Sequence, residues 1–220
     1  MATVVLSTAG PVAMLRFVDP PTTAFMLRDQ YIAWRAQTPG YEFTQRWTDW
    51  DQISGPVKLA VVAAEDQKFP QHSGFDFDSI ENALEQRRTG QSTRGASTIT
   101  QQVAKNLFLW PGQSWLRKAI EAWFTVLIES FWSKQRILEV YLNVAEFGPG
   151  TFGVGAAAER YFGKPAAQLN AWEAARLAAV LPNPKRLSAA APSPYVIERQ
   201  QWIHAQMKRL GGPQWLEQHW

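Results

Sequence analysis

One stretch decides the fold: Gly95-Ala96-Ser97-Thr98-Ile99-Thr100-Gln101-Gln102-Val103-Ala104-Lys105-Asn106-Leu107. It predicts a loop that runs into a helix, because Ser97 or Thr98 can accept hydrogen bonds from the free backbone N–H groups of a first helical turn. Apolar residues recur at four-residue steps and predict a stripe that faces a core: Ile99, Val103 and Leu107. A neighbouring stripe carries a hydroxyl, an amide and a cation: Thr98, Gln102 and Lys105. The stretch alone fits either an anion-binding helix or an amphipathic helix with a solvated face.

The composition sets broad limits on the function. A chain of 220 residues can form one sizeable domain or two small ones. The formal net charge of +3 suits an anionic substrate or an anionic membrane surface, and it is too small to indicate a nucleic-acid partner. Eleven tryptophans fit membrane interfaces, sugar sites or an aromatic core. The absence of cysteine excludes disulfides and thiolate metal sites and is compatible with the cytoplasm or the periplasm.

The N-terminal segment, residues 1–19, is mildly apolar but interrupted by Gly10, Pro11 and Arg16. A membrane-spanning helix needs about 20 consecutive apolar residues, so this segment is too short and too broken to span. It also lacks the basic region that opens a signal peptide. Two interpretations remain open: the end of a truncated membrane anchor, or a flexible N-terminus. Residues 20–220 are expected to form the functional domain.

Most of the remaining chain is predicted to be helical. Periodicity and capping residues predict helices over approximately these ranges: 24–35, 57–66, 78–88, 98–109, 115–132, 134–147, 156–162, 171–181 and 195–210, the last of them amphipathic. Further expected N-caps are Thr22 or Thr23, Ser54, Ser133 and Asn170. The stretch 41–50 has alternating aromatic residues and predicts a short extended segment or hairpin. Neither an internal repeat nor a long linker divides the chain. The expected fold is therefore all-α, a single helical domain with at most a short extended hairpin.

Two adjacent carboxylates, Glu65 and Asp66, are placed at the C-terminal end of a helix that is apolar almost all round. The helix dipole disfavours negative charge there, and adjacent side chains point about 100° apart. The two groups therefore face different surroundings. The alternative interpretation is structural: Asp66 pairs with Lys68 or Arg94, and Glu65 is solvated.

A second group of charges lies in the helix that Ser114 is expected to cap. Arg117 and Glu121 share one helical face at i, i+4, and Lys118 is their neighbour. As a surface ion pair they would contribute only a few tenths of a kcal/mol. Two carboxylates in separate environments suit glycosyl chemistry, however, and cations suit a phosphate-bearing leaving group.

A glycine-rich turn follows the helix over 134–147: Gly148, Gly150, Gly153 and Gly155. No strand precedes it and no Gly-Lys-Ser/Thr follows it, so a phosphate-binding loop is a weak interpretation. Close approach of helices is the preferred one.

Five ordered motifs give the chain a close resemblance to the family 51 glycosyltransferases, the peptidoglycan polymerases, and to their monofunctional Gram-negative members. The motifs cover residues 65–76, 95–106, 117–121, 137–164 and 173–184, and they include Glu65-Asp66-Gln67-Lys68-Phe69, Arg117-Lys118-Ala119-Ile120-Glu121 and Tyr161-Phe162-Gly163-Lys164. Each motif is weak alone, and the five in order are specific. The resemblance extends from about Pro20 to the C-terminus.

The resemblance implies a lysozyme-like helical fold and polymerisation of lipid II, with a donor linked to undecaprenyl diphosphate and inversion from α to β. It implies that Glu65 is the general base and Glu121 the second carboxylate of the site. Lys105, Arg117 and Lys118 would neutralise the departing diphosphate. No cofactor is required, and a divalent metal (Mg²⁺ or Mn²⁺) at the diphosphate is left open. Further candidate substrate-binding residues follow from motif positions: Thr98, Gln101, Gln102, Ser97, Phe69, His72 and Asp66. For Asp66 and His72 a structural role is an equal alternative.

The resemblance also implies a setting. The expected location is the bacterial inner membrane, with the catalytic domain on its periplasmic side. The expected partners are lipid II, the growing lipid-linked glycan, the membrane surface and proteins of cell division and wall synthesis, with no nucleic acid. Because no penicillin-binding serine motif follows, transpeptidase activity is not expected.

Two rival functions belong to other classes. A lysozyme-like muramidase or lytic enzyme would use Glu65 as a general acid, but it has no need of the cations Lys105 and Arg117. A non-catalytic, membrane-associated module that binds glycan or lipid predicts that replacing Glu65 or Glu121 leaves function intact.

Overall fold

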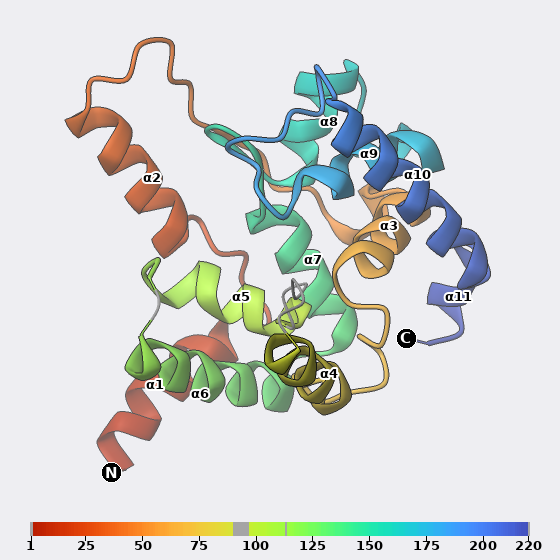
Figure 1. Cartoon of the computed structure of the whole chain (residues 1–220). Coiled ribbons are helices and arrows are strands. Elements are labelled where there is room, and N and C mark those ends of the chain that lie inside the picture. The colour runs from red at the N-terminus through yellow and green to blue at the C-terminus, as the bar shows by residue number, and fades with distance from the viewer. Residues whose placement is uncertain (1, 90–96, 113, 220) are drawn as a thin grey trace.

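The computed structural model describes residues 2–89, 97–112 and 114–219, and these are mainly helical (Figure 1). The positions Arg94, Gly95 and Ala96 lie outside the described residues. The longer helices are α1 (Ala2–Met14), α2 (Ala24–Arg35), α3 (Gly55–Glu65), α4 (Phe77–Arg88), α5 (Ile99–Phe108), α6 (Trp115–Phe131), α7 (Lys134–Val144), α8 (Val154–Phe162), α9 (Ala171–Val180) and α10 (Pro194–Arg209). The short elements are α11 (Gln214–Glu217), two 3₁₀ turns (Trp50–Gln52, Ala166–Gln168) and three strands, β1 (Thr44–Gln45), β2 (Glu146–Gly148) and β3 (Thr151–Phe152).

Helix starts follow the predicted caps closely. Side-chain oxygens accept from the first-turn backbone at each expected position: Thr23, Ser54, Thr98, Ser114, Ser133 and Asn170. Thr98 rather than Ser97 caps α5, and Gln101 completes a capping box by accepting from the Thr98 backbone N–H. These local hydrogen bonds fix where α5 begins, and α5 carries much of the candidate site.

The core surrounds α3, whose residues from Val57 to Ala63 are all buried. Helices α9 and α10 pack on one side of α3, and α5 packs between α6 and α7 (Figure 1). Because α3 is enclosed in this way, its C-terminal residue Glu65 is held at the junction of the two groups of helices.

The small sheet corrects the predicted end of one helix. α7 stops at Val144, and residues that were expected to continue it form β2. β1 runs parallel to β3, so the extended segment near residue 44 is an edge strand and not a hairpin. Gly150 has φ +68°, and a Cβ on it would lie 2.3 Å from the carbonyl oxygen of Glu42. The glycine-rich turn therefore allows the segment that leads into β1 to approach its backbone closely. Periodicity alone does not reveal this contact.

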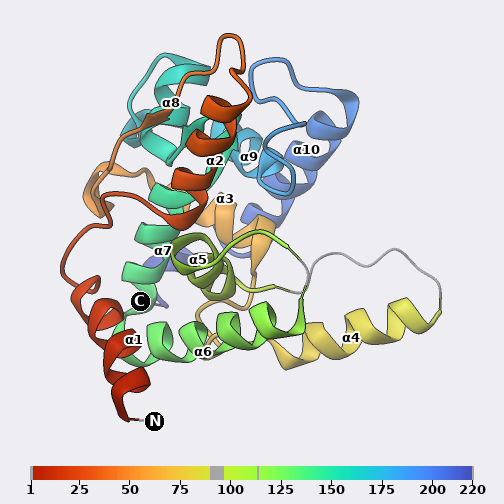
Figure 2. The same ribbon diagram turned by 90° about the vertical axis from the view of Figure 1, so that its left-hand side faces the viewer.

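The N-terminal helix α1 packs against α6 at the base of the molecule (Figure 2). Trp132 Nε1 donates to the carbonyl oxygen of Val12 over 2.7 Å, and Trp123 Nε1 donates to Thr8 Oγ1 over 3.2 Å. Val12 is fully buried, so the expectation of a flexible N-terminus is wrong for this part of the segment. Among the described residues, no helix has the length and apolar character needed to cross a membrane.

Candidate active site

Three adjoining cavities form a continuous cleft beside α5. The largest has a volume of about 640 Å³, and a smaller one of about 370 Å³ shares Ala64, Glu65, Ser97 and Trp202 with it. A third, of about 290 Å³, shares Gln102, Lys105, Leu181 and Pro182 with the largest. Glu65 therefore lies within a cleft that extends in both directions from it.

Glu65 is held by residues from two other helices. Gln102 Nε2 of α5 donates to Glu65 Oε2 over 2.9 Å, and Gln102 Oε1 accepts from the Tyr141 hydroxyl over 3.1 Å. On the other side, Arg199 Nη2 of α10 lies 3.5 Å from Glu65 Oε1. The carboxylate is thus oriented through both of its oxygens, while its side chain remains 13% exposed to the cleft.

Burial raises the pKa of the Glu65 carboxyl. The hydrogen bond from Gln102 and the positive charges of Arg199 and Lys105 oppose this effect and favour the ionised form. The structure therefore excludes the solvated Glu65 of the structural alternative. A carboxylate whose pKa is raised by burial can accept a proton near neutral pH.

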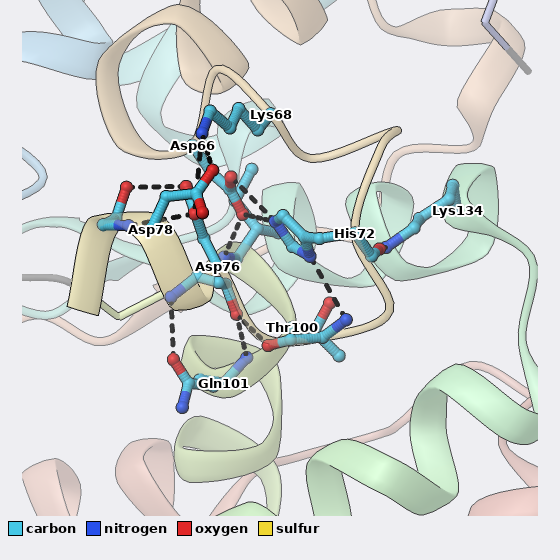
Figure 3. Close-up of polar contacts among 12 residues, drawn as sticks. Asp66, Lys68, His72, Asp76, Asp78, Thr100, Gln101 and Lys134 are labelled. Atoms are coloured by element: carbon cyan, nitrogen blue, oxygen red, sulfur yellow. Dashed lines mark hydrogen bonds and ion pairs between the residues drawn. The ribbon is translucent and has the colours of Figure 1, made fainter. Parts of the chain in front are cut away.

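Asp66 faces away from Glu65 and ties the end of α3 to the start of α5. Its Oδ2 accepts the backbone N–H of Ile99 over 3.0 Å, and both of its oxygens lie 3.0 Å from His72 Nε2 (Figure 3). The backbone N–H of Gly74 donates to His72 Nδ1, so the proton of a neutral His72 ring is on Nε2 and faces Asp66. The structural alternative that paired Asp66 with Lys68 is wrong, since Lys68 Nζ binds Asp78 Oδ2 at 2.7 Å.

The network around His72 continues into two more helices. Lys134 Nζ of α7 donates to the His72 carbonyl oxygen over 2.6 Å and to Glu129 Oε1 over 2.8 Å, and Thr100 Oγ1 donates to the same Glu129 oxygen. These bonds hold the loop after α3 against α5, α6 and α7. The loop that directly follows Glu65 in the chain is therefore held in place by these three helices.

The second carboxylate, Glu121, is 2% exposed and is enclosed by its own helix neighbours. Arg117 Nη1 donates to Glu121 Oε2 over 2.7 Å, and Lys118 Nζ contacts Glu121 Oε1. Glu121 and Arg117 form a buried ion pair and not the weak surface pair of the structural alternative, while the Lys118 side chain is partly exposed. Among the described residues, these three side chains do not line the three cavities that contain Glu65 or Lys105.

Lys105 connects the two charge groups. Burial lowers the pKa of its ammonium group, the negative charges of Glu121 and Glu65 raise it, and the positive charges of Arg117 and Lys118 lower it. Its Nζ lies 5.5 Å from the centre of the Phe25 ring. Lys105 therefore presents a cation to the cleft, within electrostatic reach of both carboxylates.

The structure separates the other candidate residues by position. Ser97, Gln102 and Lys105 line the large cavity, while Asp66 and Thr98 border the smaller one. The Thr98 hydroxyl donates to the Gly74 carbonyl oxygen and accepts the backbone N–H of Gln101 in the helix cap. The Gln101 side chain accepts the backbone N–H of Thr98, which completes the capping box. Phe69 is fully buried beside His72, with Lys134 Nζ 4.6 Å from its ring centre. Direct substrate contact does not fit Phe69 in this arrangement, because its ring belongs to the core.

Sequence reasoning missed the wall that α10 contributes. Tyr195, Glu198, Arg199 and Trp202 all line the large cavity. They recur at steps of three and four residues, which places them on one helical face. That spacing was interpreted only as amphipathicity, and no local signal indicated that this face meets Glu65.

Comparison with known proteins supports one family. The family model described as Transglycosylase matches residues 33–208. Proteins named "Biosynthetic peptidoglycan transglycosylase" are similar over most of the chain. The one from Pseudomonas entomophila is 55% identical over 213 residues, covering 96% of this chain and 90% of the relative. The one from Xanthomonas oryzae pv. oryzae is 53% identical over 205 residues, covering 93% and 84%. A third, from Pseudomonas fluorescens, is 55% identical and covers 93% and 85%.

Proposed function

The chain belongs to the transglycosylase family, and on that premise we propose that it is a peptidoglycan glycosyltransferase that polymerises lipid II. The donor is the growing glycan on undecaprenyl diphosphate, and the acceptor is the sugar hydroxyl of the next lipid-linked unit. The observation that carries the proposal is the buried, doubly oriented Glu65 carboxylate beside Lys105 in an extended cleft.

In the proposed reaction Glu65 takes the proton from the acceptor 4-hydroxyl as its oxygen attacks the donor anomeric carbon. The new C–O bond forms on the face opposite the bond to the diphosphate, which breaks with its electron pair leaving on phosphate oxygen. The configuration therefore inverts from α to β. Because a hydroxyl is a poor nucleophile unless a base lies within hydrogen-bond reach, the orientation of Glu65 by Gln102 and Arg199 supports this role.

Positive charge is available for the leaving diphosphate. Lys105 lines the cleft, and Arg117 and Lys118 are held by Glu121 within its electrostatic reach. We assign Glu121 the role of holding these two cations, since both of its oxygens contact them. Among the described residues, no group of three or more acidic or histidine side chains is arranged to hold a metal ion.

A membrane setting is part of the proposal, with the domain at the periplasmic face of the inner membrane. Large apolar side chains are exposed on α6 and on the segments that flank it and α1: Phe17, Trp110, Trp115, Leu116 and Val126. Trp115 is 92% exposed. Such a surface suits a lipid interface. Co-sedimentation with anionic phospholipid vesicles should fall when Trp115 and Leu116 are both replaced by Ser. Equal binding by the double variant would contradict this docking surface.

The function is tested by incubating labelled lipid II in detergent with the wild type and with Glu65→Gln, and resolving products by length. We expect long glycan from the wild type and a loss of more than about a hundredfold from the variant. Clearing of a cell-wall suspension without polymer formation would instead support the muramidase. Retention of lipid II binding by both proteins, with no turnover by either, would support a binding module.

A further inference from the structure

We propose that Arg199 is a positioning residue that keeps the Glu65 carboxylate ionised at neutral pH. The inference rests on the proposed function. It adds which residue stabilises the ionised Glu65 carboxylate, the form that can accept a proton. It concerns α10, from which sequence reasoning identified no candidate.

The geometry places the guanidinium beside the carboxylate. Arg199 Nη2 lies 3.5 Å from Glu65 Oε1 and 3.5 Å from the carbonyl oxygen of Ala64, the residue before it. The cation therefore holds both the side chain and the backbone at the end of α3. Both side chains are only 13% exposed, so solvent screens this pair weakly.

The position of Glu65 disfavours its ionised form, an effect that the hydrogen bond from Gln102 and the charge of Arg199 both oppose. A carboxylate at the C-terminal end of a buried helix is disfavoured by burial and by the helix dipole. Within about 4–6 Å an opposite charge favours the ionised form. Without Arg199, the Gln102 hydrogen bond and the more distant Lys105 would be left to oppose burial.

The other charged groups near Glu65 do not duplicate this contact. The charged neighbours from its own helix end and from the packed helices are Asp66, Lys105 and Glu198, and the titratable but neutral one is Tyr141. Charged residues of α9 are engaged elsewhere: Glu173 with Lys164, and Arg176 with Gln200. α11 meets α3 at its opposite end, where Pro213 approaches Gly55. Within the part of the chain that the structure describes, Arg199 makes the only salt bridge to Glu65.

Two contacts orient the Arg199 guanidinium: those of Nη2 with Glu65 Oε1 and with the Ala64 carbonyl oxygen. Its Nε is buried and has no hydrogen-bond partner among the described residues, which costs stability and does not add to it. A guanidinium fixed in this way acts on Glu65 through its charge and needs no reorganisation during the reaction.

The test is the pH dependence of kcat/KM for lipid II polymerisation by the wild type, Arg199→Gln and Arg199→Lys. The acid limb should move to higher pH by about one to two units in Arg199→Gln, because more of Glu65 is then protonated at a given pH. Arg199→Lys keeps the charge and should move the limb less. Arg209→Gln removes the same charge from an exposed position on α10 and should leave the profile unchanged.

A second readout is independent of activity. The pKa of Glu65 can be followed through its ¹³C-labelled side-chain carboxyl resonance, identified by its absence in Glu65→Gln. A rise of this pKa in Arg199→Gln supports the inference. A lower activity plateau with an unmoved limb and an unmoved Glu65 pKa would overturn it and leave the proposed function standing. If the wild type makes no glycan, the proposed function fails, while the ¹³C titration still decides the effect of Arg199 on Glu65.

Discussion

The Asp66 carboxylate accepts the backbone N–H of Ile99, the first residue of α5, over a distance of 3.0 Å. A negative charge is thereby placed at the positive end of a helix dipole, where it is stabilising. Its neighbour Glu65 lies at the unfavourable end of α3. One dipeptide therefore joins the two helices, and its two carboxylates experience opposite helix ends.

Replacing Asp66 should destabilise the fold. Asp66→Asn retains the shape but loses charge-assisted bonds to Ile99 and His72, and we expect a loss of about 1–3 kcal/mol in the free energy of unfolding. Urea denaturation measures the loss. Asp78→Asn, at an exposed ion pair with Lys68, is the control and should cost less than about 1 kcal/mol. Equal effects of the two substitutions would refute the supporting role of Asp66.

The alkaline limb of activity should report Lys105. Because burial lowers the pKa of its ammonium group, Lys105 loses its charge at a lower pH than an ordinary lysine. Lys105→Arg keeps the charge at all accessible pH values, so the limb should move to higher pH even where the rate falls. Initial polymerisation rates between neutral and strongly alkaline pH test this. An unmoved limb would mean that another group titrates there.

Glu146 should make stability depend on pH. Burial raises the pKa of its carboxyl to about 7, and the charge of Lys185 only partly opposes this. With a folded-state pKa above the unfolded one, its favourable contribution is complete below about pH 4 and is lost as the pH rises through about 7. Relative to the wild type, Glu146→Gln should therefore gain about 1–2 kcal/mol between pH 4 and pH 8, after allowance for screening. Chemical denaturation at both pH values measures the change, and a constant difference would contradict it.

Two glycines with similar backbone angles should respond differently to alanine. In Gly150→Ala the new Cβ would clash with the Glu42 carbonyl oxygen, and alanine would have to adopt a positive φ. We therefore expect a loss of more than about 2 kcal/mol in the free energy of unfolding. Gly163→Ala meets only the positive φ, since no atom lies within 4 Å of its added Cβ, and should lose about 1 kcal/mol. Thermal unfolding of both variants makes the comparison. Similar losses would show that the approach of Glu42 is relieved by a small shift.

The sequence was most informative where structure is local. The caps at Thr23, Ser54 and Asn170 depend on residues within one turn, and each lies where the sequence predicted it. The Arg117–Glu121 pairing likewise follows from spacing on one helix. The polar stripe on the helix over 98–109 also singled out Gln102, and the family resemblance placed it in the site, but neither predicted its contact with Glu65.

Features that depend on distant segments were not predicted. β2 forms because β3 pairs with it and β1 pairs with β3, so the end of α7 is set by residues elsewhere in the chain. One alternative for Asp66 was a pairing with the nearby cations Lys68 or Arg94, yet its partners are His72 and the Ile99 N–H, which the fold brings to it. The burial of Glu121 depends on packing of α6 against α5, and spacing along one helix does not reveal packing.

The contact between Glu65 and Arg199 also has a consequence for biosynthesis. A ribosome completes α3 early and α10 near the end of the chain, so the base exists for most of synthesis without its neighbouring cation. A chain that stops before α10 would lack the Arg199 side of the cleft and the helix that packs on α3. The base and its neighbouring cation are therefore brought together only once nearly the whole chain has been made.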